Sequence, residues 1–399
     1  YVLVYGSLML GFGALGDRFG YLRMFRAGLV LSVLAFSVCA LAPSYGGLLA
    51  GRALQGVAVA LTVSCAPALA TLLVDEARRT RALGAFAATQ ALAAVVAPVL
   101  GGVLVETFGW PGVFGFRVPI ALLALLGLPA LAPAAARQRL RVDGSYDARG
   151  SALLAAGVSM LLLAPSLLGP GGSMPGALLA AGCGVVAITV FVRRERRAAV
   201  PFLPASVARD VRFRLLNTAS CVIQAAGFAV PLLLPYNLLR NGWTAVESGG
   251  PLAVWALGSL AGSAIAARVV LRLGAHQATW VAAVLAGVGL AGIATWPAVP
   301  DLPSMLPWLV LQGLGMGLFQ VAYTDAVIAA LPISSRGVAG GLSMVARTVG
   351  VVVGATVWMG MVQAFERGDG GFGTIHALAA AAAGVAAAMI AFSRYGTGR

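Results

Sequence analysis

The sequence predicts an all-α, polytopic membrane protein with thirteen visible transmembrane helices. Of the 399 residues, 60% are hydrophobic and 10% are charged, and the mean hydropathy is +0.93. A soluble domain carries about 25% charged residues, so this chain lacks the polar side chains that a surface in water requires. Lipid must therefore contact most of the surface, and helices satisfy their backbone hydrogen bonds internally in lipid.

The chain contains a series of apolar runs near the length of about 20 residues that a helix needs to cross a bilayer. These runs cover residues 1–15, 24–42, 47–73, 82–105, 112–132, 151–168, 176–192, 211–239, 250–273, 278–296, 304–331, 337–363 and 374–393. The chain begins with Tyr1, already inside an apolar run. We therefore expect one further span before Tyr1, which would give fourteen.

The arginines orient these spans. The net charge is +14. Every second connector between spans is rich in arginine, and the connectors of the opposite set contain only Arg117, Arg240 and Arg367. Because arginine-rich connectors stay on the cytoplasmic side, the arginine-rich set predicts a cytoplasmic C-terminus in the inner (plasma) membrane. The same clustering between apolar runs argues against binding of nucleic acid.

The longest basic connectors divide the chain into three parts. Residues 133–150 and 193–214 bracket a pair of short spans. The expected parts are an N-terminal helical bundle without its first helix over 1–132, an inserted helix pair with basic cytoplasmic loops over 133–210, and a C-terminal six-helix bundle over 211–399. Two similar halves around an insertion are typical of transporters built from repeats.

The sequence predicts no metal site and no cofactor. Its four cysteines lie far apart in separate apolar runs, which is not a zinc or disulfide spacing. A membrane enzyme such as an acyltransferase would need a His–Asp or similar cluster at the membrane surface, and His276 and His376 do not provide one.

Charged and polar residues inside spans are the main candidates for function, because a charge at the bilayer centre costs about 2.5–3.5 kcal/mol. Arg52 lies near the start of a span, and Gln55 follows it by about one helical turn. Asp325 is the one carboxylate placed well inside a span, and Arg347 lies in the next span. Tyr323 could line a substrate cavity.

Each of these residues also has a structural interpretation. Asp325 could lie near the inner interface or pair with Arg347, and Arg52 could make a structural ion pair or contact a backbone carbonyl. Tyr323 could be an interfacial anchor, which is a common role for tyrosine near span ends. These alternatives stay open at the level of sequence.

Two further segments carry glycine patterns. The loop from Gly13 to Arg23 holds charges in a tight turn between two spans, at Gly13, Asp17, Arg18, Gly20 and Arg23. The run 93–102 combines small residues with a helix-bending proline, at Ala97, Pro98, Gly101 and Gly102, and favours a hinge or seal over ordinary packing. Gly313, Gly315 and Gly317 are interpreted as packing residues, since the lysine of a phosphate-binding loop is missing.

These motifs, in this order, resemble the major facilitator superfamily and within it the fourteen-span drug:proton antiporters. The loop at residues 13–20 is similar to the signature loop of that superfamily, which implies that Asp17 and Arg18 help hold the outward-open state. Arg23 would replace the basic residue that is usual at position 21. Arg52, Gln55 and Gly56 resemble a fourth-span motif whose arginine is linked to proton transfer.

Two further segments resemble the same antiporter family, and the resemblance implies how the protein would transport its substrate. Residues 93–102 resemble the fifth-span antiporter motif, with Ala93 and Ala97 in place of glycines, and Arg347 fits a late-span pattern. The resemblance implies a proton-coupled secondary transporter that exports amphipathic or cationic drugs by alternating access within the lipid bilayer. The alternatives are a transporter of a specific metabolite on the same fold and a truncated remnant that does not transport.

Overall fold

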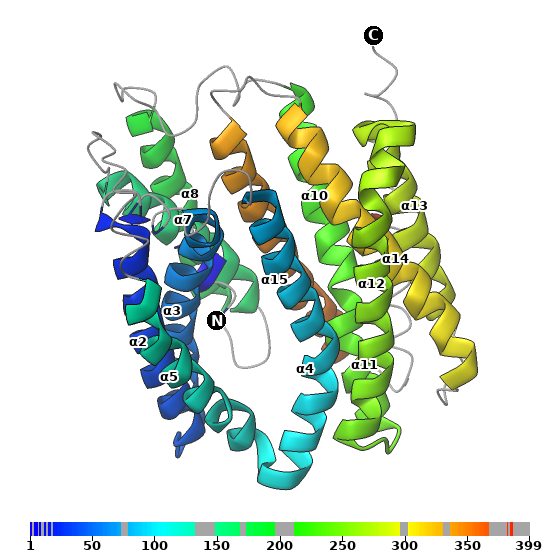
Figure 1. Cartoon of the computed structure of the whole chain (residues 1–399), viewed down its shortest axis with the longest axis horizontal. Coiled ribbons are helices and arrows are strands. Elements are labelled where there is room, and N and C mark those ends of the chain that lie inside the picture. The colour runs from blue at the N-terminus through cyan, green and yellow to red at the C-terminus, as the bar shows by residue number, and fades with distance from the viewer. Residues whose placement is uncertain are drawn as a thin grey trace. The chain divides into compact units, whose positions relative to one another are not determined.

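The described part of the chain is all-helical, as predicted (Figure 1). The computed structural model describes residues 20–72, 79–131, 148–167, 173–195, 211–295, 302–329 and 336–366, and also residues 1, 4–6, 8, 12, 15, 16, 19, 381, 384 and 385. The α-helices are α2 (Tyr21–Ala40), α3 (Tyr45–Leu72), α4 (Arg79–Gly115), α5 (Arg117–Gly127), α7 (Ala148–Ser166), α8 (Met174–Glu195), α10 (Val211–Gly227), α11 (Ala229–Arg240), α12 (Ala245–Leu273), α13 (Ala275–Ala294), α14 (Leu302–Ala329) and α15 (Arg336–Glu366). A short 3₁₀ helix, η2, covers Leu128–Leu131.

The predicted count of thirteen spans is not matched. Within the described residues, 8 helical segments are long and apolar enough to cross a membrane, and Ala152–Leu161 and Ala346–Val362 are shorter apolar helices. One reason is that the predicted spans at 82–105 and 112–132 fall in a single apolar segment, Leu92–Ala130. This segment turns at Gly109, whose φ of 68° is in the left-handed region, and not at a polar connector.

The predicted span at 211–239 consists of two helices, α10 and α11, which meet at Phe228. Pro231 has no backbone N–H to donate to Gly227, so the regular hydrogen-bond ladder is interrupted there. The bonds from Phe228 N to Gln224 O (3.0 Å) and from Leu232 N to Phe228 O (3.3 Å) keep the chain nearly continuous. The expected spans at 1–15 and 374–393 lie largely outside the described residues.

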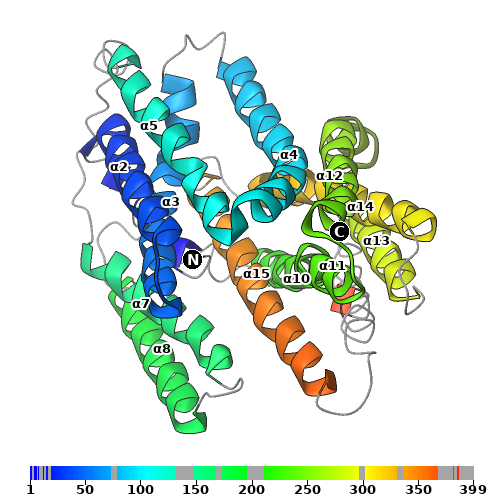
Figure 2. The ribbon, with the colours of Figure 1, turned by 90° about the horizontal axis from the view of Figure 1, so that it is seen from below.

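The chain divides into two compact units. The first contains Tyr1–Ala93, Val103–Leu167 and Ser173–Arg194, and the second contains Ala94–Gly102, Leu168–Gly172 and Glu195–Arg399. The first unit therefore holds α2, α3, α5, α7 and α8, and the second holds α10 to α15 (Figure 2). The middle of α4 belongs to the second unit. The three-part division predicted from the connectors stays a prediction.

Small residues let the helices of the first unit approach one another closely. A Cβ atom on Gly28 of α2 would lie 2.7 Å from Cγ2 of Thr62 on α3, and one on Gly51 of α3 would lie 2.7 Å from Sγ of Cys39. Cys39 is fully buried, so it packs as a small apolar residue. Close approach through small residues is the usual way that helices associate in a membrane.

In the second unit, α14 packs between α12 and α13 through glycines on all three helices. Gly258 of α12 lies under α14, where an added Cβ would be 2.6 Å from the carbonyl oxygen of Val310. Gly317 of α14 lies against the backbone of Ser259 on α12 in the same way. The other close glycines are Gly262, Gly289, Gly313 and Gly315. The interpretation of Gly313, Gly315 and Gly317 as packing residues is confirmed.

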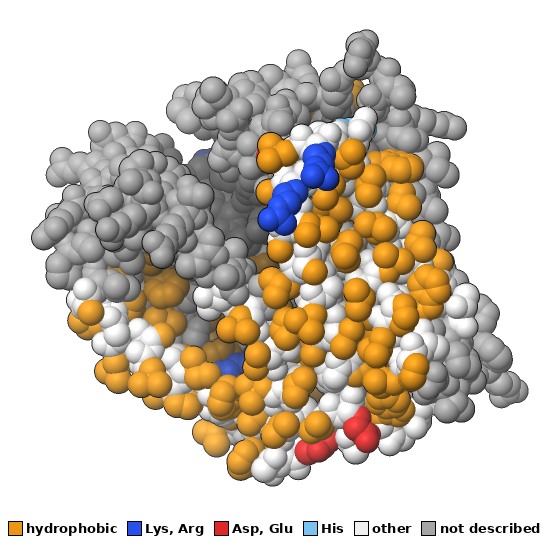
Figure 3. Space-filling view, turned by 45° about the vertical axis from the view of Figure 1, so that its right-hand side comes forward, with side chains coloured by type: hydrophobic (Ala, Val, Ile, Leu, Met, Phe, Trp, Pro, Cys, Tyr) orange, Lys and Arg blue, Asp and Glu red, His pale blue; other side chains and the backbone are white. Residues whose placement is uncertain are grey.

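The surface has the polarity of a membrane protein. Figure 3 shows hydrophobic side chains over the middle of one face, with basic side chains near its upper end and acidic ones near its lower end. Along α12, Glu247 lies in the first turn and Arg272 in the last turn. Leu257 and Leu260 lie between them and are exposed. Exposed leucines are stable in this place because hydrocarbon surrounds them.

Candidate functional site

Arg52 of α3 lies in a cluster of polar and aromatic groups in the first unit. Its Nη1 donates a hydrogen bond to Oε1 of Gln55 at 2.8 Å, as expected for residues three apart on a helix. The guanidinium carbon lies 4.6 Å from the ring centroid of Tyr1 and 5.6 Å from that of Phe114. Each cation–π contact of this kind contributes about 0.5–2 kcal/mol. The structure thus brings the predicted pair together and adds two aromatic partners.

Gln55 and the next residue form a closely packed surface on α3. Gln55 is 3% exposed, so its amide forms hydrogen bonds mainly with neighbouring protein groups such as Arg52. A Cβ added to Gly56 would lie 2.7 Å from Cβ of Val4 and 2.8 Å from the carbonyl oxygen of Tyr1. The structure therefore places the polar pair Arg52–Gln55 next to a close-packing position at Gly56.

A second arginine in this unit was missed as a candidate. Arg117 begins α5, and its guanidinium lies 5.7 Å from the ring of Phe36 on α2. The sequence analysis counted Arg117 only as a connector charge. Nothing in the sequence indicates its aromatic partner, because the two residues come from helices that are distant in sequence.

The antiporter-type residues of α4 make close backbone contacts with α12. A Cβ added to Gly102 would lie 2.6 Å from the carbonyl oxygen of Ala245, and one added to Gly249 would lie 2.8 Å from the carbonyl oxygen of Pro98. Gly101 has no atom within 4 Å of such a Cβ. The helix continues through Pro98, and the break in the dihedral angles of α4 is at Gly109. The segment therefore packs tightly at Gly102, and the exposed Ala97 lies outside this contact.

Gly102 and Gly101 offer a matched test of this contact. On the exporter role expected from the sequence, replacing Gly102 with alanine should lower the efflux rate at least about tenfold, since the methyl group would displace the backbone of α12. Replacing Gly101 with alanine should leave efflux unchanged, because the added methyl group meets no neighbour. Dye efflux from cells with equal amounts of each variant in the membrane measures both. Equal efflux in the two variants would show that the contact has no role in transport.

Tyr323 links α14 to α10 in the second unit. Its Oη donates to Oδ1 of Asn217 at 2.8 Å, and its ring stacks on Phe319 with a centroid distance of 5.5 Å. One helical turn away, Nε2 of Gln224 donates to Oε1 of Gln320 at 2.9 Å. Tyr323 is 1% exposed, so in this conformation its side chain joins two helices and does not line an open cavity. Sequence reasoning missed Asn217, Gln224 and Gln320.

Asp325 and Arg347 lie on α14 and α15 and are both exposed. Asp325 lies two residues before the end of the apolar segment Leu302–Val327. The described side chains of α14 also end at Val327, so the depth of Asp325 within its span stays a prediction, with the position near the interface as the alternative. Arg347 lies within α15 (Arg336–Glu366). Their roles in translocation stay predictions.

The charged loop is described only in part. Gly13, Asp17 and Arg18 lie outside the described residues. Gly20 precedes α2 with a φ of 94°, a left-handed conformation that glycine adopts without strain. Arg23 is exposed in the first turn of α2. The gating role of this loop stays a prediction.

The helical architecture and its sequence relatives define a membrane transporter and not an enzyme. Residues 1–355 match the sequence model described as the Major Facilitator Superfamily. The chain belongs to this superfamily.

Several relatives are named for drug resistance or export. The tetracenomycin C resistance and export protein of Streptomyces glaucescens is 30% identical over 375 residues, which cover 92% of this chain and 68% of that protein. The methylenomycin A resistance protein of Bacillus subtilis is 29% identical, with 90% and 77% covered. The multidrug efflux pump LfrA of Mycolicibacterium smegmatis is 27% identical, with 92% and 73% covered.

Solved structures share the fold. A peptide transporter POT in complex with sulfate superposes with a TM-score of 0.71 at 16% identity, over 99% of this chain and 84% of that one. The human organic anion transporter MFSD10 gives a TM-score of 0.66 at 15% identity, over 98% and 81%. At these identities the similarity supports the fold alone.

Proposed function

We propose that this protein exports amphipathic or cationic small molecules from the cell in exchange for protons. The observation that carries the proposal is the Arg52–Gln55 pair on α3, whose half-buried guanidinium contacts the rings of Tyr1 and Phe114. The relatives that are named for drug resistance and efflux support the same substrate class.

Arg52 acts by position and charge in this proposal. A guanidinium does not release its proton in proteins, so Arg52 cannot carry the transported proton. Its fixed positive charge instead raises the energy of any cation close to it, so a bound substrate cation and a bound proton disfavour each other more strongly there. The hydrogen bond to Gln55 and the rings of Tyr1 and Phe114 fix the plane of the guanidinium.

Alternating access requires contacts that form and break as the cavity opens to each side. The contact of Gly102 with α12 is suited to such a seal, because two backbones meet without flexible side chains between them. The loop with Asp17, Arg18 and Arg23 would hold one of the two states, and Tyr323 and Arg347 would contribute to the translocation path.

Asp325 is the proposed proton carrier, because a carboxylate exchanges protons readily and an arginine does not. Replacing Asp325 with asparagine should abolish efflux driven by a pH gradient while the protein still reaches the membrane. Replacing it with glutamate should retain part of the coupling. Proton-driven dye transport in everted membrane vesicles measures both variants. Unchanged coupling in the asparagine variant would remove Asp325 from the mechanism.

A further inference from the structure

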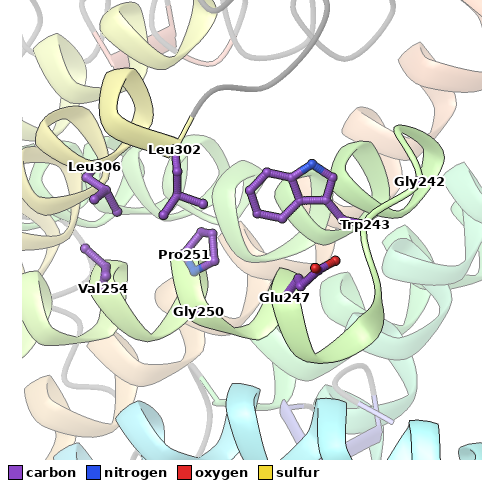
Figure 4. Close-up of a pocket in the computed structure, with 8 residues that line it drawn as sticks. All are labelled: Gly242, Trp243, Glu247, Gly250, Pro251, Val254, Leu302 and Leu306. Atoms are coloured by element: carbon purple, nitrogen blue, oxygen red, sulfur yellow. The ribbon is translucent and has the colours of Figure 1, made fainter.

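A cavity of about 690 Å³ lies at the ends of α12 and α14 where these helices begin. Its volume is within the range of about 300–1,000 Å³ that is typical of small-molecule sites. Figure 4 shows Trp243 and Glu247 on one side, with aliphatic side chains opposite them. The apolar lining comes from Pro251, Val254, Leu302 and Leu306. Trp243 and the beginnings of two helices thus line an open apolar cavity with one carboxylate at its edge.

Local backbone structure fixes Trp243 in this cavity. Helix α11 ends in a pair of hydrogen bonds, from Gly242 N to Leu239 O (3.2 Å) and from Trp243 N to Leu238 O (3.1 Å). Gly242 has a φ of 85°, which is the left-handed residue that this type of helix end requires. The turn directs the half-buried Trp243 back towards the start of α12.

A capping box holds Glu247. The side chain of Thr244 accepts a hydrogen bond from Glu247 N at 3.2 Å, and Oε2 of Glu247 accepts one from Thr244 N at 2.8 Å. A carboxylate has about four sites for hydrogen-bond donors, and this backbone bond uses one of them. Glu247 is therefore held in place while most of its capacity to accept hydrogen bonds or balance a positive charge is still available.

The described charges around the cavity favour a cation. Among the described residues of the lining, Glu247 is the ionisable one, and its full negative charge exceeds the partial positive charge of the helix end on which it lies. The nearby Arg240 is not part of the lining, and its guanidinium lies 5.8 Å from the ring of Tyr236. Arg268 and Arg272 lie towards the opposite end of α12. A carboxylate beside an indole ring, within aliphatic walls, complements a positive charge carried on an apolar body.

We propose that this cavity is a peripheral binding site for an amphipathic organic monocation, separate from the Arg52 cluster. The arginines at the other end of α12 place the cavity on the outer side of the membrane. A cation released from the transport path would be held there before it enters the medium. The choice of ligand class rests on the proposed function, whereas the site itself is defined by residues of the second unit.

Equilibrium dialysis of radiolabelled tetraphenylphosphonium against the purified full chain in detergent tests the proposal. We expect a binding phase that the Glu247→Gln variant weakens at least about fivefold, since glutamine keeps the capping box and loses the charge. Binding of the neutral triphenylphosphine oxide should be the same in both proteins. A Glu106→Gln variant, which changes an exposed carboxylate of α4 outside the cavity, is the matched control and should bind like the wild type.

Two further measurements separate the possible outcomes. The Arg52→Lys variant should keep the Glu247-dependent phase, so the peripheral site can be supported even if proton-driven efflux is not observed. The Leu306→Ala variant should weaken binding of both probes, because it removes apolar wall. Tetraphenylphosphonium affinity that is the same in the wild type and the Glu247→Gln variant would overturn the proposal. A second result would also overturn the proposal. If the wild type co-purifies with a phospholipid that the Glu247→Gln variant lacks, and tetraphenylphosphonium shows no Glu247-dependent binding, the cavity binds a lipid headgroup.

Discussion

Replacing Arg52 with lysine should reduce dye efflux to the background of cells without the protein, at least about tenfold. Lysine keeps the charge, but it has no planar group to stack on Tyr1 and Phe114 and cannot reproduce the directed bond to Gln55. A charge-assisted hydrogen bond contributes about 1.5–3 kcal/mol, and each 1.4 kcal/mol corresponds to about a tenfold change in an equilibrium constant. Efflux of a fluorescent cation from preloaded cells measures the loss.

Arg240 provides the matched control for this experiment. Its guanidinium also lies over an aromatic ring, that of Tyr236 at 5.8 Å, but it is exposed at the end of α11. The Arg240→Lys variant should therefore transport like the wild type. If Arg52→Lys also retains full efflux and full proton coupling, a positive charge alone is sufficient, and the planar contacts have no role in transport.

The Arg52 site shows which part of a functional site a sequence can indicate. The pair with Gln55 was predictable, because residues three apart on a helix are neighbours whatever the rest of the fold does. Tyr1 and Phe114 were not predictable, since they are brought to Arg52 by the packing of separate segments. A span pattern gives the positions of helices along the chain and does not give the rotation of each helix about its axis.

The same distinction applies to the fold. Apolar runs predicted the helical segments well, since burial in lipid requires length and hydrophobicity and little else. The counting of spans was less successful because the breaks have local causes. Gly109 turns the chain inside a continuous apolar segment. The break between α10 and α11 does not change the count, because Phe213–Arg240 is still one apolar segment, as predicted for 211–239. The depth of Asp325 within its span stays a prediction, because the described side chains of α14 end at Val327.

The glycines of α14 show how much of the helix packing could be predicted from the sequence. Gly313, Gly315 and Gly317 were interpreted as packing residues, because they lie inside a span and lack the lysine of a phosphate-binding loop. This interpretation did not identify α12, where Trp255 and Ser259 meet Gly313 and Ser259 meets Gly317, because the partner surface lies in a distant part of the chain. The interaction is reciprocal, with glycines on both helices, so neither helix can shift to relieve an added side chain.

Replacing Gly317 with valine should therefore prevent correct assembly of the C-terminal helices. Even a Cβ at this position would overlap the backbone of Ser259, and valine adds two further methyl groups. Overpacking usually costs about 1–3 kcal/mol and more where backbone has to move, against a typical total stability of about 5–15 kcal/mol. We expect the amount of monodisperse protein in detergent, measured by size-exclusion chromatography, to fall at least about tenfold.

Gly360 of α15 is the control for this substitution, because a Cβ added there has no atom within 4 Å. A Gly360→Val variant changes the same residue type within an apolar helix and should give the yield and elution profile of the wild type. If both variants lose yield to the same extent, the cost at Gly317 does not arise from contact with α12. Helix propensity would then be the shared cause, since valine and glycine differ in the same way at both positions. A wild-type yield for both variants would show that the added side chain at Gly317 is tolerated.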